Sequence, residues 1–546
     1  MKSGTTKFIL GAAGLYGLLM AHNDLVANPD APVWAKLIPV FVGVAIIFWL
    51  SRKWMAPGLG KFISVLFMGL GRGLEFLFFG LSRFRGARFM DVWESAGFFG
   101  FGQKGWLIDG KTRRLSEKVS YQSIMTIAGV GAGKTSTFVF PNLFSLNHCS
   151  LVITDMSGEI YEQSSGYLKS QGYDIVCLNL MDMTSSHKYN PVQNPSTFSE
   201  ISKLAHLITH ASNATGTGND QFWATGAETI VRILIQCLKN NGDESQCTLG
   251  RIKQLLNGFD HFLEGENSLF DRFLIDSTLD DQATWESYKG FLAAPEKTVL
   301  SFISTANTAL MELGNPDLVN LTSHNEIDFR KLRSQKTALF VMARQQDMSS
   351  LGFILNAFFT DLFNTLMSEL NNGLPVYCLL DEFGQLYVPQ FNIVASTARK
   401  YRLCFWLFLQ SQAQLETQYG RTEAQTIVDA LGTEIYLAGI NLETAEKLSR
   451  RMGRKRPQTF QPKIKYEDAN LMNPDEIISM RDNQALLFHG NKRPLKFRIK
   501  PYYRSLKFSR FAKLPPAELP TKHEEVPLEP LPATQDALEL AMESEV

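Results

Sequence analysis

Cysteine motifs and an excess of charge are both missing from this sequence. Its six cysteines are Cys149, Cys177, Cys237, Cys247, Cys378 and Cys404. They form no CxxC pair and no Cys/His metal spacing, which excludes a disulfide framework and a cysteine-based zinc site and fits a reducing cytosol. The formal net charge is zero. A single domain that binds DNA without sequence preference is usually basic, so the composition argues against a protein of that class. Hydrophobic residues make up 45% of the 546 residues and charged residues 20%, so most of the chain should fold, into two or three domains.

Two apolar runs near the N-terminus predict a membrane anchor. Residues 8–21 and 33–50 predict two membrane spans, of which the first is short, and the link between them is short and carries two aspartates. Residues 1–120 contain 15 Lys or Arg against 7 Asp or Glu, and many of these basic residues follow the second run. By the positive-inside rule, both ends of the anchor face the cytosol. The alternative is that the first run is a cleaved signal peptide, and the second run would then anchor the chain alone. A third run, 62–81, contains an arginine and a glutamate and is interpreted as a membrane-proximal helix.

A glycine-rich segment after a short apolar run predicts a phosphate-binding loop. Residues 124–127 suit a β-strand, and helix-compatible residues follow the loop. The nucleotide-binding residues predicted for this loop are Ala128, Gly129, Val130, Gly131, Ala132, Gly133, Lys134, Thr135 and Ser136. Small residues let backbone N–H groups surround the phosphates of ATP, while Lys134 reaches the β- and γ-phosphates and Thr135 ligates Mg²⁺. Ala128 stands where the strict pattern has glycine, and it fits only if its backbone φ is negative.

A second apolar run ends in two acids. Residues 374–380 suit a buried parallel strand, and Asp381 and Glu382 follow it. Because ligands bind at the carboxyl edge of a parallel sheet, Asp381 is expected to hold Mg²⁺ and Glu382 to orient or deprotonate the attacking water. The alternative is a strand followed by a solvated acidic turn. Gln410, at the end of the predicted strand 402–409, is expected to sense the γ-phosphate, or else to be a buried amide that caps the next helix.

Strands at 149–154, 174–180 and 337–342 alternate with helical patterns, which predicts a doubly wound, mainly parallel sheet. The predicted fold is therefore α/β, a RecA-like P-loop nucleotide-binding domain with an inserted all-helical domain and an N-terminal two-helix membrane anchor. The predicted boundaries are 1–50 for the transmembrane anchor with its short periplasmic loop, 51–105 for a membrane-proximal linker, 106–193 and 329–510 for the two parts of the nucleotide-binding domain, 194–328 for the all-helical insertion, and 511–546 for an acidic, proline-rich tail. From residue 514 onward, eight acids stand against one lysine, so we expect a mobile segment outside the core.

These features together resemble the type IV secretion system coupling proteins, which are relatives of the FtsK/RecA-like P-loop motors. The resemblance rests on the two N-terminal runs, on residues 128–135, 155–159, 189–191, 381–383 and 409–415, and on Phe222, Trp223, Ala227, Arg399 and Lys400. It implies a homo-oligomeric ring, usually a hexamer, with ATP bound between protomers and a substrate path through the centre. On that analogy Arg399 is an arginine finger that reaches the ATP of a neighbouring protomer, and the helical insertion recognises substrate.

The resemblance implies a multi-pass inner-membrane coupling ATPase with a cytoplasmic ATPase domain. Its expected partners are single-stranded DNA with an attached relaxase and the inner-membrane components of the secretion channel. Two alternatives stay open, namely a coupling ATPase for protein effectors only and a nucleotide-gated structural receptor that pumps nothing. Phe222 and Trp223 are interpreted as core packing, with base stacking as the alternative. The basic residues at 450–456 either contact phosphate or lipid headgroups or end the predicted helix 442–452, which Gly453 should terminate.

Overall fold

The computed structural model describes residues 87–520 except 92–93, 96–97, 100–102, 211–217, 265–267, 349, 371–372 and 456–468. These residues belong to the second of two compact units, Gly86–Val546, and the first unit is Met1–Arg85. The predicted membrane-spanning runs and most of the predicted tail therefore lie outside the described residues. No helix within the described part of the chain has both the length and the hydropathy to cross a membrane.

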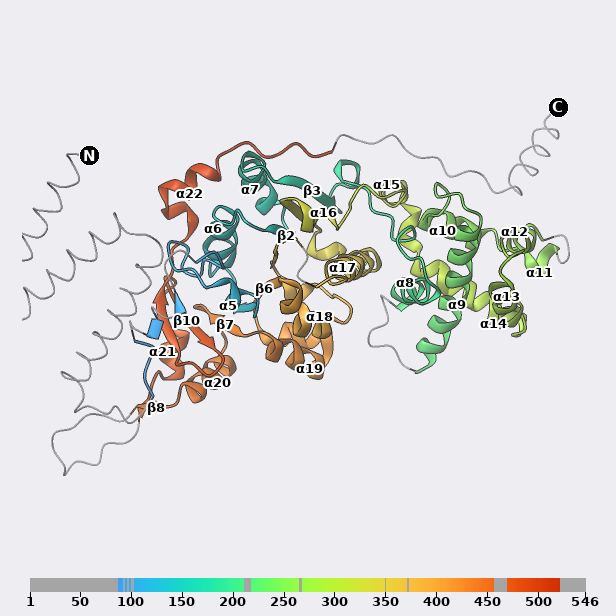
Figure 1. Ribbon diagram of the computed structural model, residues 1–546. Helices are drawn as coiled ribbons and strands as arrows, with labels where there is room; N and C mark the ends of the chain where they lie inside the picture. Colours follow the sequence, from blue (N-terminus) through green and yellow to red (C-terminus); the bar gives the residue numbers. More distant parts are fainter. Residues whose placement is uncertain are drawn as a thin grey trace, which may run out of the picture. The chain divides into compact units, whose positions relative to one another are not determined.

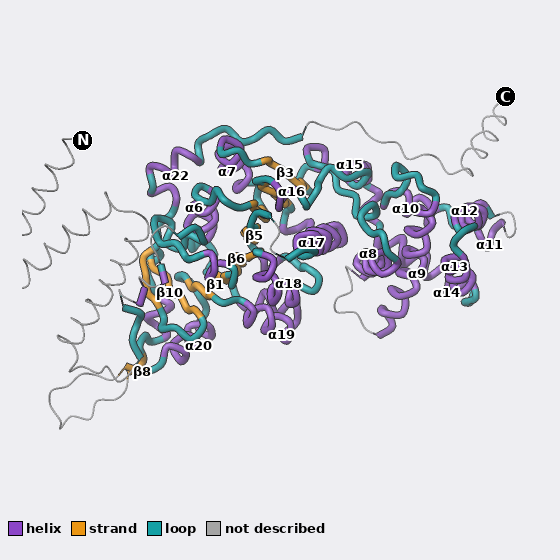
Figure 2. The backbone as a smooth tube through the Cα atoms, in the orientation of Figure 1, coloured by secondary structure: helices purple, strands orange, loops and turns teal. Residues whose placement is uncertain are grey.

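A nine-stranded sheet forms the centre of one part of this unit, and a group of helices lies beside that part (Figures 1 and 2). The strands lie in the order β11-β10-β7-β1-β6-β5-β2-β4-β3, and neighbouring strands are parallel from β7 to β3. At one edge, β10 pairs antiparallel with β7, and β11 pairs antiparallel with β10. Their bounds are Ile124–Ile127 (β1), Ser150–Asp155 (β2), Asp174–Asn179 (β3), Thr337–Met342 (β4), Val376–Leu380 (β5), Leu403–Leu409 (β6), Thr433–Tyr436 (β7), Gln484–His489 (β10) and Leu495–Arg498 (β11). The mainly parallel α/β sheet predicted from the sequence is confirmed.

Two hydrophobic cores lie on opposite faces of the sheet. Successive side chains of a strand point to opposite faces, so in β6 Phe405 and Leu407 belong to one core and Trp406 and Phe408 to the other. Every residue of β6 is buried. Burial on both faces explains why this strand is a continuous apolar run rather than an alternating pattern.

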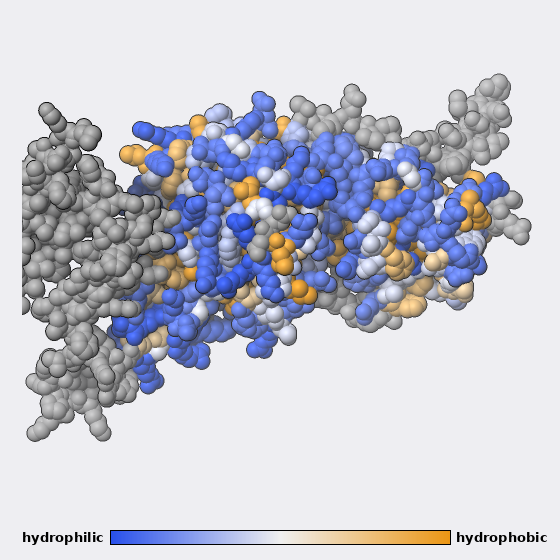
Figure 3. All heavy atoms as spheres, viewed as in Figure 1, coloured by the Kyte–Doolittle hydropathy of each residue, from blue (hydrophilic) through white to orange (hydrophobic). Residues whose placement is uncertain are grey.

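Helices cover both faces of the sheet (Figure 1). The core that includes Trp406 also takes residues from α6 (Phe140–Leu143), α7 (Glu159–Ser170) and α22 (Leu506–Phe511). The core that includes Phe405 takes residues from α17 (Gly352–Leu366), α18 (Phe391–Thr397), α19 (Gln412–Ala430) and α20 (Leu442–Met452). Over the described residues, the face shown in Figure 3 is mainly hydrophilic, with hydrophobic side chains in scattered groups.

Between β3 and β4 the described chain contains helices and 3₁₀ turns but no strand. The α-helices are α8 (Phe198–His210), α9 (Gly218–Asn240), α10 (Leu249–Asn257), α11 (His261–Glu264), α12 (Leu269–Ser277), α13 (Gln282–Leu292), α14 (Glu296–Ala309), α15 (Pro316–Leu321) and α16 (Lys331–Ser334). Helix α8 packs against α9 and also against α17, which follows β4. The helical segment is therefore connected to the sheet by packing as well as by the chain itself.

The expectation that the chain stays outside the core from residue 514 onward is wrong for its first residues. The Tyr161 hydroxyl donates a hydrogen bond to the carbonyl of Ala517 (3.1 Å), and the Ala517 N–H donates to Ser165 Oγ (3.0 Å). Gly166 permits this contact, because a Cβ there would lie 1.8 Å from the Pro515 carbonyl oxygen. Composition indicated disorder, yet one small buried residue and a glycine opposite it are enough to hold this short segment on α7.

Candidate nucleotide-binding site

The predicted phosphate-binding loop begins where β1 ends, between the ends of two neighbouring strands. The N–H of Ala128 donates to the carbonyl of Leu409, the last residue of β6 (3.1 Å), and the N–H of Gly129 donates to the carbonyl of Ala438 after β7 (3.3 Å). Ala128 is not among the residues with positive φ, so its backbone has the negative φ that alanine needs at this position. The loop is therefore anchored on both sides before it turns.

Glycine is required at two kinds of position in this loop. Gly131 and Gly133 have φ of +73° and +77°, which favour glycine because other side chains are strained there. Gly129 is required for a different reason, since a Cβ would lie 2.5 Å from the carbonyl oxygen of Gly439. The sequence reasoning missed Gly439, and only the pairing of β1 with β7 reveals its role.

The acid-bearing strand brings Asp381 to the loop. Strand β5 lies one strand away from β1, across β6. The Thr135 hydroxyl donates to Asp381 Oδ2 (2.8 Å), and the Thr154 hydroxyl on β2 donates to the Asp381 carbonyl (2.9 Å). Burial raises the pKa of Asp381 to about 6, against the opposing effect of the hydrogen bond from Thr135. Two segments almost 250 positions apart in the chain thus meet at the carboxyl edge of the sheet.

Glu382 contacts both Lys134 of the loop and Gln410, which follows β6, the strand between β1 and β5. Lys134 Nζ lies 3.2 Å from Glu382 Oε1, and the Gln410 side-chain amide donates to Glu382 Oε2 (3.2 Å). The side chain of Gln410 therefore contacts the acid, whereas its backbone N–H donates to Gln414 Oε1 (3.1 Å). Glu382 has φ of +50°, a strained conformation for a non-glycine residue and one that is common at functional sites.

The donor set of the site fits a nucleotide with Mg²⁺. Lys134 has only 7% of its side chain exposed, and its Nζ makes an ion pair with Glu382 but no hydrogen bond of acceptable geometry. A buried ammonium with unused donors is costly unless acceptors arrive, and phosphate oxygens supply them. The adjacent hydroxyl of Thr135 and carboxylate of Asp381 are the oxygen ligands that Mg²⁺ prefers.

Arg399 is not brought to this site. It is exposed on a 3₁₀ turn, Ala398–Tyr401, that leads into the amino end of β6, whereas Gln410 follows the carboxyl end of the same strand. Seven residues of β-strand span about 23 Å. Arg399 therefore lies near the opposite edge of the sheet from the loop of its own chain.

Other motif residues have structural partners. The Asp155 carboxylate accepts hydrogen bonds from the backbone N–H groups of Ser157, Gly158 and Tyr161, which fixes the turn into α7. The rings of Phe222 and Trp223 contact each other, and both contact Phe302 of α14. This agrees with the packing interpretation, although Phe222 remains more than half exposed.

Among the basic residues after β7, Arg451 donates to both carboxylate oxygens of Glu434 (2.8 Å each). Gly453, with φ of +78°, ends helix α20 as predicted. Arg456 of the same group lies outside the described residues.

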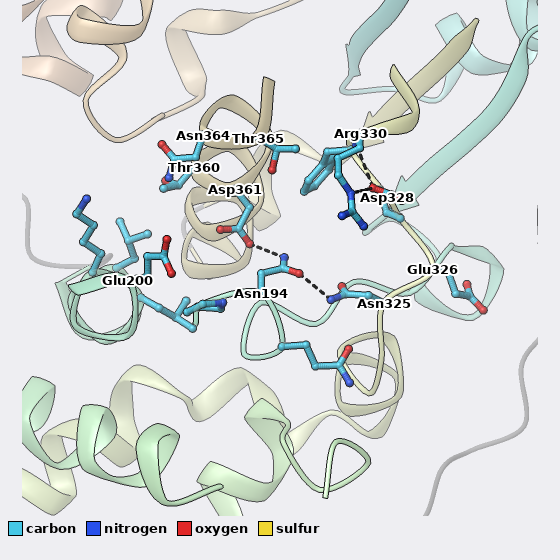
Figure 4. A pocket seen from close by; sticks show the side chains of 17 residues that line it. Asn194, Glu200, Asn325, Glu326, Asp328, Arg330, Thr360, Asp361, Asn364 and Thr365 are labelled. Carbon is cyan, nitrogen blue, oxygen red and sulfur yellow. Dashed lines mark hydrogen bonds and ion pairs between the residues drawn. The ribbon is translucent and has the colours of Figure 1, made fainter. Parts of the chain in front are cut away.

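A polar cavity of about 770 Å³ lies away from these motifs, at the segments through which the chain enters and leaves the helical segment (Figure 4). The Asn194 side chain donates to Asp361 Oδ2 (2.9 Å) and accepts from the Asn325 side chain (3.0 Å). The Tyr189 hydroxyl also donates to Asp361. Asp361 on α17 therefore contacts the entering segment directly and the leaving segment through Asn194, and burial raises the pKa of Asp361 from its usual value.

A RecA-like α/β fold with a loop lysine, a threonine and an acid pair at the carboxyl edge defines a P-loop nucleotide-binding protein. Residues 90–525 match the family described as Type IV secretory system Conjugative DNA transfer. The match covers well over half of the chain, so the protein belongs to this family.

Sequence relatives include Protein VirD4 of Rhizobium radiobacter, which is 24% identical over 409 residues that cover 69% of this chain and 56% of the relative. The type IV secretion system-coupling protein VirD4 of Bartonella henselae is 21% identical over 421 residues that cover 70% of this chain and 64% of the relative. The chain thus spans less than two thirds of the length of these curated relatives.

Solved structures show the same fold. The unbound bacterial conjugative coupling protein TrwBdeltaN70 is similar with a TM-score of 0.59 and 16% identity, over 77% of this chain and 94% of that one. The plasmid coupling protein TrwB in complex with ADP and Mg²⁺ is similar with a TM-score of 0.54 and 17% identity, over 77% and 95% of the two chains. At these identities the likeness establishes the architecture alone.

Proposed function

We propose that this protein is the inner-membrane coupling ATPase of a type IV secretion or conjugation system, which binds ATP and Mg²⁺ and drives a substrate to the channel. The observation that carries the proposal is the meeting of Lys134, Thr135, Asp381 and Glu382 at one edge of the sheet. Family membership and the nucleotide named for the TrwB complex support it. These four side chains supply the parts that phosphoryl transfer requires, which are a phosphate clamp, two metal-facing oxygens and a water-orienting base.

Each side chain has a distinct role in this proposal. The backbone N–H groups of residues 128–136 and the Lys134 ammonium bind the phosphates, and Thr135 and Asp381 hold Mg²⁺. The metal would neutralise charge on the β- and γ-phosphates. Glu382 positions and deprotonates the attacking water once Lys134 has turned to the phosphates. Gln410, hydrogen-bonded to Glu382, responds to the presence of the γ-phosphate.

A ring of identical subunits, a hexamer in the proposal, completes the site. Arg399 lies about one strand length from the loop of its own chain, and it is exposed. A planar guanidinium of this kind can stabilise transferring phosphate only in a neighbouring subunit.

The wider assembly follows the family. Residues 1–50 anchor the protein in the inner membrane as two helices, and residues 51–105 form a linker on the cytoplasmic side. The nucleotide-binding domain comprises 106–193 and 329–510, the helical domain 194–328 recognises substrate, and 511–546 form the acidic tail. The proposed partners are single-stranded DNA with its relaxase and the inner-membrane components of the channel.

The ATPase proposal is tested with Lys134→Ala in the full-length protein. We expect the variant to insert into the membrane normally but to lose ATP hydrolysis by at least about a hundredfold, together with substrate transfer. The matched control is Lys447→Ala, which removes an exposed lysine paired with Glu443 on α20 and should leave both activities unchanged. Transfer at the wild-type level by Lys134→Ala would show that the motor assignment is wrong.

The arginine finger is tested by mixing two variants. Glu382→Gln and Arg399→Ala should each be inactive alone. In a mixed ring, some interfaces combine an intact Glu382 from one subunit with an intact Arg399 from the next, so part of the activity should return. Absence of recovery in rings shown to contain both variants would contradict a role for Arg399 in the neighbouring site.

The substrate class is tested on the same purified protein. Stimulation of ATP hydrolysis by single-stranded DNA favours DNA transfer, whereas capture of effector proteins by the helical domain without such stimulation favours protein transfer. Tight ATP binding with negligible turnover would instead identify a nucleotide-gated receptor.

A further inference from the structure

Three potential metal ligands meet on two helices outside the nucleotide-binding site. His206 and His210 lie one turn apart on α8, and their rings stack with centroids 4.0 Å apart. Glu228 reaches them from α9. Its Oε2 atom lies 3.0 Å from His206 Nδ1 and 3.6 Å from His210 Nδ1. A single carboxylate oxygen therefore faces both imidazole rings.

The spacing of these groups can accommodate a metal ion as well as an ion pair. One ligand atom from each of the three residues lies within 4.8 Å of the other two, so an ion between them requires only small side-chain movements. His210 Nδ1 also lies 3.2 Å from the His206 carbonyl oxygen, and metal binding by this nitrogen would replace that contact.

The three residues are accessible from solvent. They lie on the wall of a groove of about 750 Å³, whose other residues include Tyr387 and Glu423 from the sheet-bearing part of the chain. The side chain of His206 is 56% exposed, so an ion can enter without unfolding the helices. The open groove leaves room for water or another ligand at a fourth coordination position.

We propose that His206, His210 and Glu228 form a binding site for a divalent transition metal ion such as Zn²⁺. Two imidazoles and one carboxylate with an open fourth position are a ligand set that Zn²⁺ takes in proteins. The same set discriminates against Mg²⁺, which prefers oxygen ligands and retains its water molecules. The site is thus chemically separate from the nucleotide site, and no cysteine takes part in it.

Metal binding here would join α8 to α9. Helix α8 is the first α-helix after β3, and it contacts α17 as well as α9. An ion held by both helices stabilises their packing in the folded state only, so the midpoint of thermal unfolding should rise with metal concentration.

The test uses the full chain, purified in detergent without a histidine tag and without nucleotide, and titrated with Zn²⁺ in excess Mg²⁺. The wild-type protein should bind one Zn²⁺ per chain, measured by isothermal titration calorimetry, and its unfolding midpoint should rise. His206→Gln and Glu228→Gln should each bind Zn²⁺ at least about tenfold more weakly, with no rise in the midpoint. The matched control is His324→Gln, because His324 also sits beside a glutamate, 3.5 Å from Glu326, but without a second histidine there.

Each outcome bears on the proposal. Loss of binding in both ligand variants but not in His324→Gln supports it, provided that the metal-free unfolding midpoints stay close to the wild-type value. If one variant is unstable, the other decides, because Glu228→Gln keeps the shape of the side chain. Equal binding by all four proteins, or no stoichiometric binding by the wild-type protein, would overturn the proposal and leave an ordinary histidine–glutamate ion pair.

Discussion

Replacing Glu382 with glutamine should destabilise the protein without nucleotide and strengthen its binding of nucleotide. Without nucleotide, Glu382 is the counter-ion of Lys134 and the acceptor for Gln410. When phosphate arrives, Lys134 must exchange this carboxylate for phosphate oxygens. The variant removes the competing partner, so the exchange costs less, and affinity rises by the free energy that the ion pair contributed.

The distance and exposure set the expected size of this effect. Two unit charges 3.2 Å apart attract by about 5 kcal/mol at an effective dielectric constant of 20. Most of that is offset by desolvation of Lys134, and solvent screens Glu382, whose side chain is 28% exposed. A net contribution of about 1 to 2 kcal/mol remains, which corresponds to an affinity gain of about 5- to 30-fold.

The assay compares dissociation constants for ADP and unfolding free energies from urea titrations without nucleotide. Hydrolysis should be lost in the same variant, so tighter binding and inactivity occur together. Introducing Glu382→Gln into a Lys134→Ala background provides the control, because the gain in affinity should vanish there. An equal gain with and without Lys134, or weaker binding by Glu382→Gln, would refute the ion-pair exchange.

Three further predictions concern the stability of the folded protein. Gly129→Ala should destabilise the protein by about 1–3 kcal/mol and abolish nucleotide binding, because its Cβ would lie 2.5 Å from the Gly439 carbonyl oxygen. Trp406→Phe should cost about 1–3 kcal/mol in urea unfolding, since the buried indole N–H donates to the Thr126 hydroxyl (2.8 Å). The Asp361→Asn variant should become more stable relative to the wild-type protein as pH rises. The pKa of Asp361 is raised in the folded protein, so the protonated carboxyl group stabilises the wild-type fold below the unfolded pKa of 3.8. This stability is lost as pH rises through the folded pKa.

Each of these has a control or a contradictory outcome. Gly290→Ala adds a methyl group in helix α13 with no atom within 4 Å, so it should be neutral or slightly stabilising. Adding Thr126→Val to Trp406→Phe should recover part of the lost stability, because both polar partners are then removed. A stability difference between Asp361→Asn and wild type that stays constant from acid to neutral pH would contradict the raised pKa.

Sequence patterns predict the structure best where a buried strand ends in residues with a recognisable chemical function. Strand β1 was predicted to the residue, and β5 within two residues, because each is a continuous apolar run that ends in residues with a recognisable function. The same reasoning placed Thr135 and Asp381 at one edge of the sheet. It could not reveal that they touch, because that depends on β6 lying between β1 and β5.

Short or partly polar elements could not be predicted. Strand β11 alternates buried and exposed residues over four positions only, and β7 contains a threonine and a glutamate among its four residues. The strained backbone of Glu382 gave no signal, since a non-glycine residue rarely has positive φ. The spacing of His206 and His210 is visible in the sequence, but Glu228 joins them only when α9 packs on α8.

The position of β6 connects these observations. Its carboxyl end leads to Gln410, which contacts Glu382 beside the loop, and its amino end follows Arg399 at the other edge of the sheet. In the proposed ring, one end of this strand therefore faces the nucleotide of its own subunit, and the other end faces that of a neighbour. Because β6 is buried on both faces and paired on both sides, its two ends cannot shift independently at low cost. A change at Gln410 after hydrolysis would then be accompanied by a change at Arg399, which is a physical basis for coupling between adjacent sites.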